Sequence, residues 1–221
     1  MTQLDSLSGP IGAIIFDCDG TLVDSEPITV KVLIDHVAEF GLKLEYDEAL
    51  GLFVGRDMAM IMVELEKRMD RPLPEDFVEE YRRRQAIELS RSVTCIPGAV
   101  ELLKVVSRGK ASICVASNAP RAKIDLNLQA TDLEEFFQPS QIFSAYDVGK
   151  WKPDPTLFLH AAEQLGVAPK NCVVIEDSLA GIDAGIAAGM QTIGYAPTAS
   201  QQPTDKVQFV HHLADLIPVL G

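Results

Sequence analysis

Six short apolar runs, separated by segments with helical periodicity, constrain the fold of this chain more than any other feature. The runs are rich in β-branched residues and lack internal charges, as buried strands do; they cover residues 11–16, 111–117, 141–145, 171–176, 191–196 and 206–210. Helical patterns occur at 98–108, 120–130, 154–166, 179–188 and 213–220. Strands that alternate with helices over short loops favour a parallel, doubly wound sheet. The sequence therefore predicts an α/β fold.

The stretch from about Pro27 to Ile96 differs from the rest, because it contains no convincing strand. Glu, Arg, Lys, Leu and Met recur there at helical spacing, as in MAMIMVELEKRM and EDFVEEYRRRQAIELS. We interpret this stretch as a helical subdomain that is inserted after the first strand. The predicted domains are a core of residues 1–26 and 97–221 and an inserted α-helical domain of residues 27–96.

Polar side chains follow four of the predicted strands, at the points where these strands end. Ligands of a doubly wound sheet bind at the carboxyl ends of its strands, so these side chains mark the predicted site. They are one hydroxyl, one amide, one lysine and four carboxylates: Ser117, Asn118, Lys152, Asp17, Asp19, Glu176 and Asp177. Alternation along an extended chain predicts that Asp17 and Asp19 point to the same side. Two like charges so close require a cation or a shared proton.

This set of residue types indicates phosphate chemistry assisted by a metal ion. Oxygen ligands without histidine or thiolate suit Mg²⁺, which usually keeps waters and binds a substrate phosphate. Lys152 can contact both a phosphate and a carboxylate. A carboxylate can itself be a nucleophile and form an aspartyl-phosphate.

Each signal has a simpler explanation when it is taken alone. The Asp pair before Gly20 could form a structural turn, and Glu176-Asp177 could cap the following helix. A calcium loop is excluded, because Leu22 and Ile28 stand where an EF-hand needs glycine and glutamate. No GxGxxG follows the first strand, so a dinucleotide site has no support.

Composition excludes several other classes of partner. The formal net charge of −13 argues against nucleic acid or an anionic membrane as a partner. No apolar stretch approaches the ~18 residues of a membrane span, and the first residues lack a signal-peptide pattern. We therefore expect a cytoplasmic protein.

The four cysteines have no CxxC spacing, which favours buried reduced thiols over disulfides or zinc. The sequence leaves the oligomeric state open, and a monomer is compatible with it.

Taken together and in this order, the four motifs resemble those of the haloacid dehalogenase superfamily. DCDGTLVDS is similar to its first motif, DxDGT, and VASN, KWKPDP and VIEDS are similar to the second, third and fourth. The helical insertion resembles the mobile cap of the β-phosphoglucomutase-like branch. The resemblance covers residues 11–220 and implies a Rossmann-like core with a helical cap.

The resemblance also implies roles for the residues that match the motifs. Asp17 would be the nucleophile that accepts the phosphoryl group. Asp19 would protonate the leaving alcohol and then deprotonate the attacking water. Ser117 and Lys152 would hold phosphate oxygens, with backbone N–H groups near Thr21 and Asn118. Mg²⁺ would be bound by the Asp17 side chain, the Asp19 backbone carbonyl, Asp177 and Glu176.

The resemblance narrows the substrate to a small phosphorylated metabolite. Arg56 occupies the place of a cap arginine that grips a second anionic group, although it could also be an ordinary surface arginine. The stretch SAYDVGKWKPDP, with Trp151, is similar to that of bacterial 6-phosphogluconate and sugar-phosphate phosphatases; Trp151 could also simply pack beneath the loop. We therefore expect an Mg²⁺-dependent phosphatase of a sugar phosphate such as 6-phosphogluconate.

Two alternatives stay open at this point. A phosphomutase of the same fold would need a histidine in the first cap helix, but Thr29 occupies the matching position. His36 lies about two helical turns further on, too far to substitute simply. A non-catalytic phosphate-binding protein is the other alternative, and the intact set of Asp17, Asp19, Lys152 and Asp177 argues against it.

Overall fold

A computed structural model describes residues 7–53, 58–198, 204 and 206–221. The chain divides into two compact units. The α/β unit comprises Met1–Asp24 and Thr94–Gly221, and the helical unit comprises Ser25–Val93. Within the α/β unit, the Asp24 N–H donates to the Thr94 carbonyl at 2.9 Å, and Val23 forms an antiparallel bridge with Cys95. These bonds join the two points where the chain leaves the α/β unit and returns to it.

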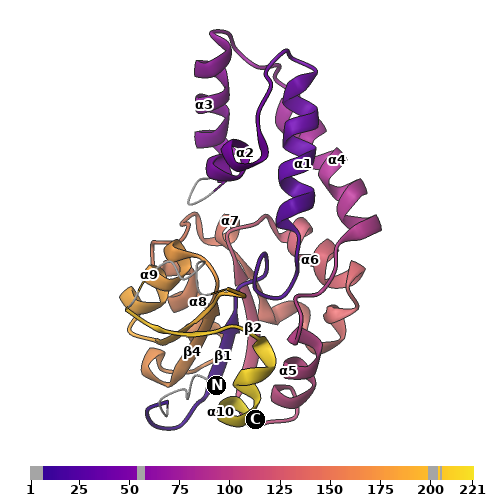
Figure 1. Ribbon diagram of the computed structural model, residues 1–221. Coiled ribbons are helices and arrows are strands. Elements are labelled where there is room, and N and C mark those ends of the chain that lie inside the picture. Colours follow the sequence, from indigo (N-terminus) through magenta and orange to yellow (C-terminus); the bar gives the residue numbers. More distant parts are fainter. Residues whose placement is uncertain (1–6, 54–57, 199–203, 205) are drawn as a thin grey trace. The chain divides into compact units, whose positions relative to one another are not determined.

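The α/β unit is built on one parallel sheet, as Figure 1 shows. Its strands are β1 (Ala13–Phe16), β2 (Ser112–Ser117), β3 (Ile142–Ser144), β4 (Cys172–Glu176), β5 (Gln191–Tyr195) and β6 (Gln208–Val210). They lie in the order β3-β2-β1-β4-β5-β6, and every neighbouring pair is parallel. The chain builds outward from β1 first on one side and then on the other, so β1 and β4 meet where the direction of winding reverses.

Helices cover both faces of this sheet (Figure 1). One face packs against α8 (Thr156–Gln164) and α9 (Leu179–Ala187), and their shared core includes Ile15, Cys114, Phe158, Val174 and Ala184. The helices α5 (Ala99–Val106), α6 (Arg121–Ala130) and α10 (Ile217–Leu220) lie on the other side. All four residues of β1 are fully buried, because a central parallel strand is covered on both faces. The predicted α/β, doubly wound fold is confirmed.

Two of the differences between observed and predicted elements concern α-helices. A single turn of helix, α7 (Ala145–Val148), directly follows β3, where no helix was expected. The Ser144 hydroxyl caps it by accepting from the Tyr146 N–H at 3.2 Å. The helix predicted at 213–220 is divided into a 3-10 turn, Leu213–Leu216, and α10. Pro218 lacks the N–H that a continuous α-helix would need there.

The helical unit contains α1 (Glu26–Ala38), α2 (Tyr46–Phe53), α3 (Met58–Met69) and α4 (Phe77–Ser92). Its core joins residues of all four helices, among them Leu33, Leu52, Leu65 and Phe77. His36 is buried in this core, where its ring stacks on Phe77 with a centroid distance of 4.3 Å. His36 is therefore a packing residue of the helical unit.

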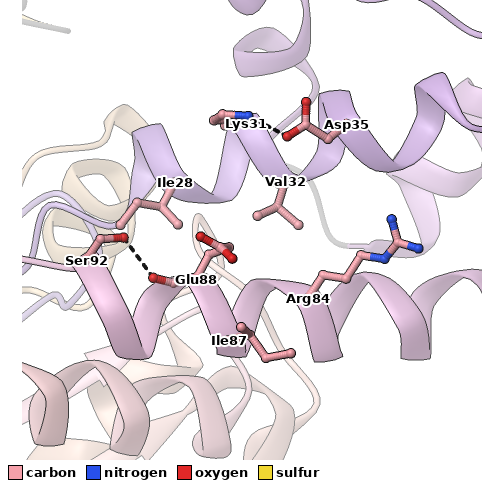
Figure 2. Close-up of a pocket in the computed structure, with 8 residues that line it drawn as sticks. All are labelled: Ile28, Lys31, Val32, Asp35, Arg84, Ile87, Glu88 and Ser92. Atoms are coloured by element: carbon pink, nitrogen blue, oxygen red, sulfur yellow. Dashed lines mark hydrogen bonds and ion pairs between the residues drawn. The ribbon is translucent and has the colours of Figure 1, made fainter.

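A groove of about 420 Å³ lies between α1 and α4 (Figure 2). Its lining combines apolar and charged side chains: Ile28, Lys31, Val32, Asp35, Arg84, Ile87, Glu88 and Ser92. The cations of this groove already have anionic partners, since Lys31 pairs with Asp35 and Arg84 pairs with Glu39 and Glu80. The groove contains none of the residues that the sequence predicts for the site.

All four cysteines are free, and Cys18, Cys114 and Cys172 are buried. The burial of these three thiols was expected, whereas Cys95 is only partly buried. Among the helices of the described residues, none has both the length and the apolar character that a membrane crossing requires.

A substitution at Gly194 of β5 tests the close packing between β5 and β6 at the edge of the sheet. A Cβ atom at this position would lie 2.2 Å from Cε1 of Phe209, the residue that pairs with Gly194 on β6. We expect Gly194→Ala to lower the free energy of unfolding by about 1–3 kcal/mol, because the added methyl group overpacks the site. Urea denaturation measures this change.

Gly51→Ala is the matched control, because a Cβ on this exposed residue of α2 would meet nothing within 4 Å. Alanine favours a helix by about 1 kcal/mol over glycine, so this variant should be as stable as the wild type or more so. Equal destabilisation of both variants would contradict the packing at Gly194.

Candidate active site

The loop after β1 places the two neighbouring aspartates at the carboxyl edge of the sheet. The Asp17 N–H still donates to the Ile175 carbonyl of β4 at 3.0 Å, so Asp17 continues the strand. The chain then turns, and the Gly20 N–H donates to the Val23 carbonyl at 2.8 Å. Gly20 has φ +88°, and a Cβ there would lie 2.3 Å from Oδ2 of Asp177. Only glycine fits this turn, because both its backbone conformation and the nearby carboxylate exclude a side chain.

Lys152 is the central cation of the site. Its Nζ donates to Asp17 Oδ1 at 2.5 Å, to Glu176 Oε1 at 2.7 Å and to the Ala116 carbonyl at 2.8 Å. These acceptors use all three protons of the ammonium group. Burial by itself would lower the pKa of Lys152, but the charges of Asp17 and Glu176 outweigh it and raise the pKa. Lys152 therefore stays charged although its side chain is only 2% exposed.

Asp17 is held in a buried position that disfavours its charge. Burial raises the pKa of Asp17 to about 7; Lys152 opposes this shift and Glu176 adds to it. One ammonium group thus serves two buried carboxylates. A further cation beside Asp17 would favour its ionised form.

Glu176, the last residue of β4, has protein partners at both carboxylate oxygens. Oε1 accepts from Lys152, while Oε2 accepts from the N–H and the hydroxyl of Ser178, each at 2.8 Å. A Cβ at Gly181 would lie 1.8 Å from Oε1, so glycine makes room for this carboxylate in α9. The arrangement favours a role in orienting Lys152, and the sequence-based assignment of Glu176 as a metal ligand stays a prediction.

Thr21 and Asp177 form a second polar contact at this edge. The fully buried Thr21 hydroxyl donates to Asp177 Oδ1 at 2.9 Å. The Thr21 side chain therefore orients Asp177. The contact between backbone N–H groups near Thr21 and the substrate phosphate stays a prediction.

Ser117 and Asn118 lie at the end of β2, next to the loop that carries Lys152. The Asn118 side chain accepts from the Lys152 N–H at 2.9 Å and donates to the Lys152 carbonyl at 3.4 Å. It therefore binds the backbone of Lys152 at both of its polar groups. Ser117 is 2% exposed, and its hydroxyl accepts from the Ala119 N–H at 3.2 Å.

Two further residues at this edge, Lys123 and Asn127 of α6, were not predicted from the sequence. Lys123 Nζ lies 2.8 Å from Asp19 Oδ1, and Asn127 Nδ2 donates to the same oxygen at 2.9 Å. The available signal was their spacing of four residues on the helix that follows the second strand, which places both on one helix face.

The sequence also suggested roles for Arg56 and Trp151. Arg56 lies outside the described residues. Trp151 is partly buried and packs against the core that the sheet shares with α8 and α9, and its ring meets that of Tyr146 edge-on at a centroid distance of 5.3 Å. This contact agrees with a packing role for Trp151.

The donor set of the site fits a hard divalent cation. In the described part of the chain, no three His, Cys, Asp or Glu side chains form a group that could bind a metal by themselves. Asp17 and Asp177 offer two carboxylates at the carboxyl edge of the sheet. Oxygen donors of this kind, completed by water and substrate, suit Mg²⁺.

Comparison with known proteins gives consistent similarities. A family model described as haloacid dehalogenase-like hydrolase matches residues 14–195. The chain is 34% identical to the 6-phosphogluconate phosphatase of Escherichia coli K12, covering 93% of both chains. It is 30% identical to hexitol phosphatase A of the same organism, covering 93% of this chain and 92% of the relative.

Two solved structures are similar to this chain over almost its whole length. A haloacid dehalogenase family hydrolase from Deinococcus radiodurans R1, with bound phosphate and sodium, is 32% identical with a TM-score of 0.74. The match covers 94% of this chain and 93% of that one. A β-phosphoglucomutase from Thermotoga maritima, described as putative, is 25% identical with a TM-score of 0.76, covering 95% of this chain and 98% of that one.

Lys152→Met tests the central cation of the site. The substitution leaves Asp17 and Glu176 buried without their shared partner, so the free energy of unfolding should fall by about 3 kcal/mol. The deficit should shrink as the pH is lowered, because protonation neutralises Asp17, whose pKa is raised by burial. Urea denaturation at about pH 5, 6, 7 and 8 measures both effects.

The exposed neighbour Lys150 supplies the matched control, Lys150→Met. The double variant Lys152→Met/Glu176→Gln should recover part of the lost stability, since it removes one of the two unpaired charges. If Lys152→Met were as stable as Lys150→Met across this pH range, the described ion pairs would not hold the site together.

Proposed function

Because the chain belongs to the haloacid dehalogenase-like hydrolase family and is a phosphoric monoester hydrolase, we propose that it hydrolyses a small sugar phosphate with the help of Mg²⁺. The predicted family and enzyme class are confirmed. The substrate, the metal and the roles of individual residues are the proposal. One observation carries it most directly: a buried carboxylate, Asp17, is held at the sheet edge by a charged lysine that can also bind a phosphate.

The proposed reaction consists of two half-reactions. An oxygen of Asp17 attacks the phosphorus atom, and the bond from phosphorus to the ester oxygen breaks. Asp19 gives its proton to the leaving alcohol. Asp19 then takes a proton from a water molecule that attacks the phosphorus atom of the aspartyl-phosphate, which releases inorganic phosphate and restores the Asp17 carboxylate. Nucleophile and proton carrier are different residues, which explains why two aspartates stand two positions apart.

Phosphate binding is assigned to Lys152 and Ser117, with backbone N–H groups near Thr21 and Asn118. All three protons of the Lys152 ammonium group have protein acceptors, so a bound phosphate oxygen must replace or share one of them. The contacts of Asn118 with both polar backbone groups of Lys152 keep the lysine in place during this exchange.

Mg²⁺ would be held by Asp17, the backbone carbonyl of Asp19 and Asp177. When bound, it would supply positive charge for the phosphate oxygens and for the ionised form of Asp17. Glu176 would act through Lys152, because both of its oxygens bind protein groups. The chain has a net charge of −13, so this local positive charge is needed to attract an anionic substrate.

The names of the relatives support a sugar phosphate as the substrate class. A 6-phosphogluconate phosphatase and a hexitol phosphatase are similar over almost the whole chain. Gluconate and hexitols are both linear polyols, and gluconate carries an additional carboxylate. Arg56 is proposed to bind the group at the far end of such a substrate, since a guanidinium matches a carboxylate.

The first test measures phosphate release from purified protein. We expect release from 6-phosphogluconate or a hexitol phosphate, loss of activity in EDTA and recovery with Mg²⁺, because the Asp17 nucleophile and the phosphate both need the cation's charge. Glucose 6-phosphate and phosphoglycolate serve as comparison substrates. Activity that persists in EDTA after dialysis would contradict the metal assignment.

The same assay decides between hydrolysis and phosphomutase chemistry. Thr29 in α1 accepts a hydrogen bond from Gln85 at 3.2 Å and is buried, and its hydroxyl cannot replace a charged histidine. We therefore expect inorganic phosphate from β-glucose 1-phosphate in the presence of a bisphosphate primer. Glucose 6-phosphate appearing faster than inorganic phosphate would favour the mutase instead.

Asp17→Asn tests the nucleophile. The amide is a far weaker nucleophile of nearly the same shape, so less than about 1% of the activity should remain. The unfolding transition and Mg²⁺ binding are measured beside activity, because the substitution also alters a proposed ligand. Residual metal-dependent activity well above this level would exclude Asp17 as the nucleophile.

A further inference from the structure

The Asp19 carboxylate is held by two side chains of one helix. Lys123 Nζ and Asn127 Nδ2 lie 2.8 Å and 2.9 Å from the same oxygen, Oδ1. The two residues are four positions apart on α6, so both extend from one helix face. Neither belongs to a motif that the sequence analysis used.

The helix that carries them is firmly fixed in the α/β unit. Ile124 and Leu128 of α6 are fully buried. At the start of the helix, the Arg121 guanidinium donates to the carbonyls of Ile142 and Pro139, each at 3.0 Å. Its Nε also donates to Asp125 at 2.8 Å. Lys123 and Asn127 are therefore presented to Asp19 from a rigid support.

The contacts at Asp19 have a structural cost. Asn127 is fully buried, and its Oδ1 has no hydrogen-bond partner. A buried acceptor without a partner is unfavourable by about 1–3 kcal/mol, and an apolar residue of similar shape would avoid this. The Lys123 side chain is only 16% exposed, so a flexible chain is ordered beside Asp19. Packing alone does not require either residue.

We propose that Lys123 and Asn127 are positioning residues for Asp19. By holding Oδ1, they fix the plane of the carboxyl group so that its other oxygen faces the leaving alcohol and later the attacking water. A proton transfer depends on this orientation because donor and acceptor must come within hydrogen-bond distance in the transition state. The inference rests on the proposed function and concerns the orientation of Asp19.

Two substrates separate this role from a merely structural one. An alkyl phosphate needs a proton for its leaving alcohol, whereas p-nitrophenolate leaves without one. The ratio kcat/KM reports on the steps up to departure of the leaving group. Lys123→Met and Asn127→Leu should lower kcat/KM for 6-phosphogluconate, or the best alkyl substrate found, by about tenfold or more. For p-nitrophenyl phosphate the loss should stay below about threefold.

Several variants serve as controls. Lys123→Arg keeps the cation and should retain most of the activity on the alkyl phosphate. Lys170→Met removes an exposed lysine elsewhere in the α/β unit and should change neither substrate's kcat/KM. In an Asp19→Asn background, Lys123→Met should cause no further loss, because two residues that act through one group are not additive. If Asn127→Leu does not fold, the Lys123 variants decide alone.

Equal losses on both substrates would overturn the proposal, since they would indicate phosphate binding or a general effect on the fold. Unchanged kcat/KM in Lys123→Met would overturn it too. So would an additional loss in the Asp19→Asn background. A wild type without phosphatase activity would instead overturn the proposed function, and this inference with it, so the two failures are distinct.

Discussion

The buried ammonium group of Lys152 is the interaction on which the rest of the site depends. It joins the ends of three adjacent strands, because its acceptors are Asp17 after β1, Ala116 of β2 and Glu176 of β4. Two buried carboxylates beside each other would repel, and one buried cation by itself would be strongly disfavoured. Each charge is tolerated only because the others are present. The strand order β2-β1-β4 brings these three ends together, so the chemistry of the site depends on the topology of the sheet.

The same dependence explains what could be predicted from the sequence. Short apolar runs predicted six strands, and all six are observed within about two residues at each end. Residues that follow these strands were expected at one edge, and Asp17, Lys152 and Glu176 do meet there. The family was identified correctly because its motifs lie at strand ends, where local sequence and chemistry coincide. The roles assigned from that resemblance stay proposals.

Other features could not be predicted because they arise between residues far apart in the chain. Asp19 and Asn127 are separated by 108 positions, and nothing local to either one specifies the contact. The contacts of Asn118 with the Lys152 backbone were missed for the same reason, since asparagine after a strand is also an ordinary turn residue. The protein contacts of Glu176 were not predicted either. The Ser178 hydroxyl donates to this carboxylate and Gly181 leaves space for it, while its role as a metal ligand, which the resemblance implies, stays a prediction.

The bonds between the points where the chain leaves and re-enters the α/β unit have a consequence for modularity. Asp24 and Thr94 are hydrogen-bonded neighbours, and Val23 bridges to Cys95. The inserted stretch 25–93 therefore begins and ends at neighbouring positions of the α/β unit. The α/β unit can accommodate this insertion without a change in its own backbone. Helical units of different length or composition could be grafted at this junction without altering the register of the sheet.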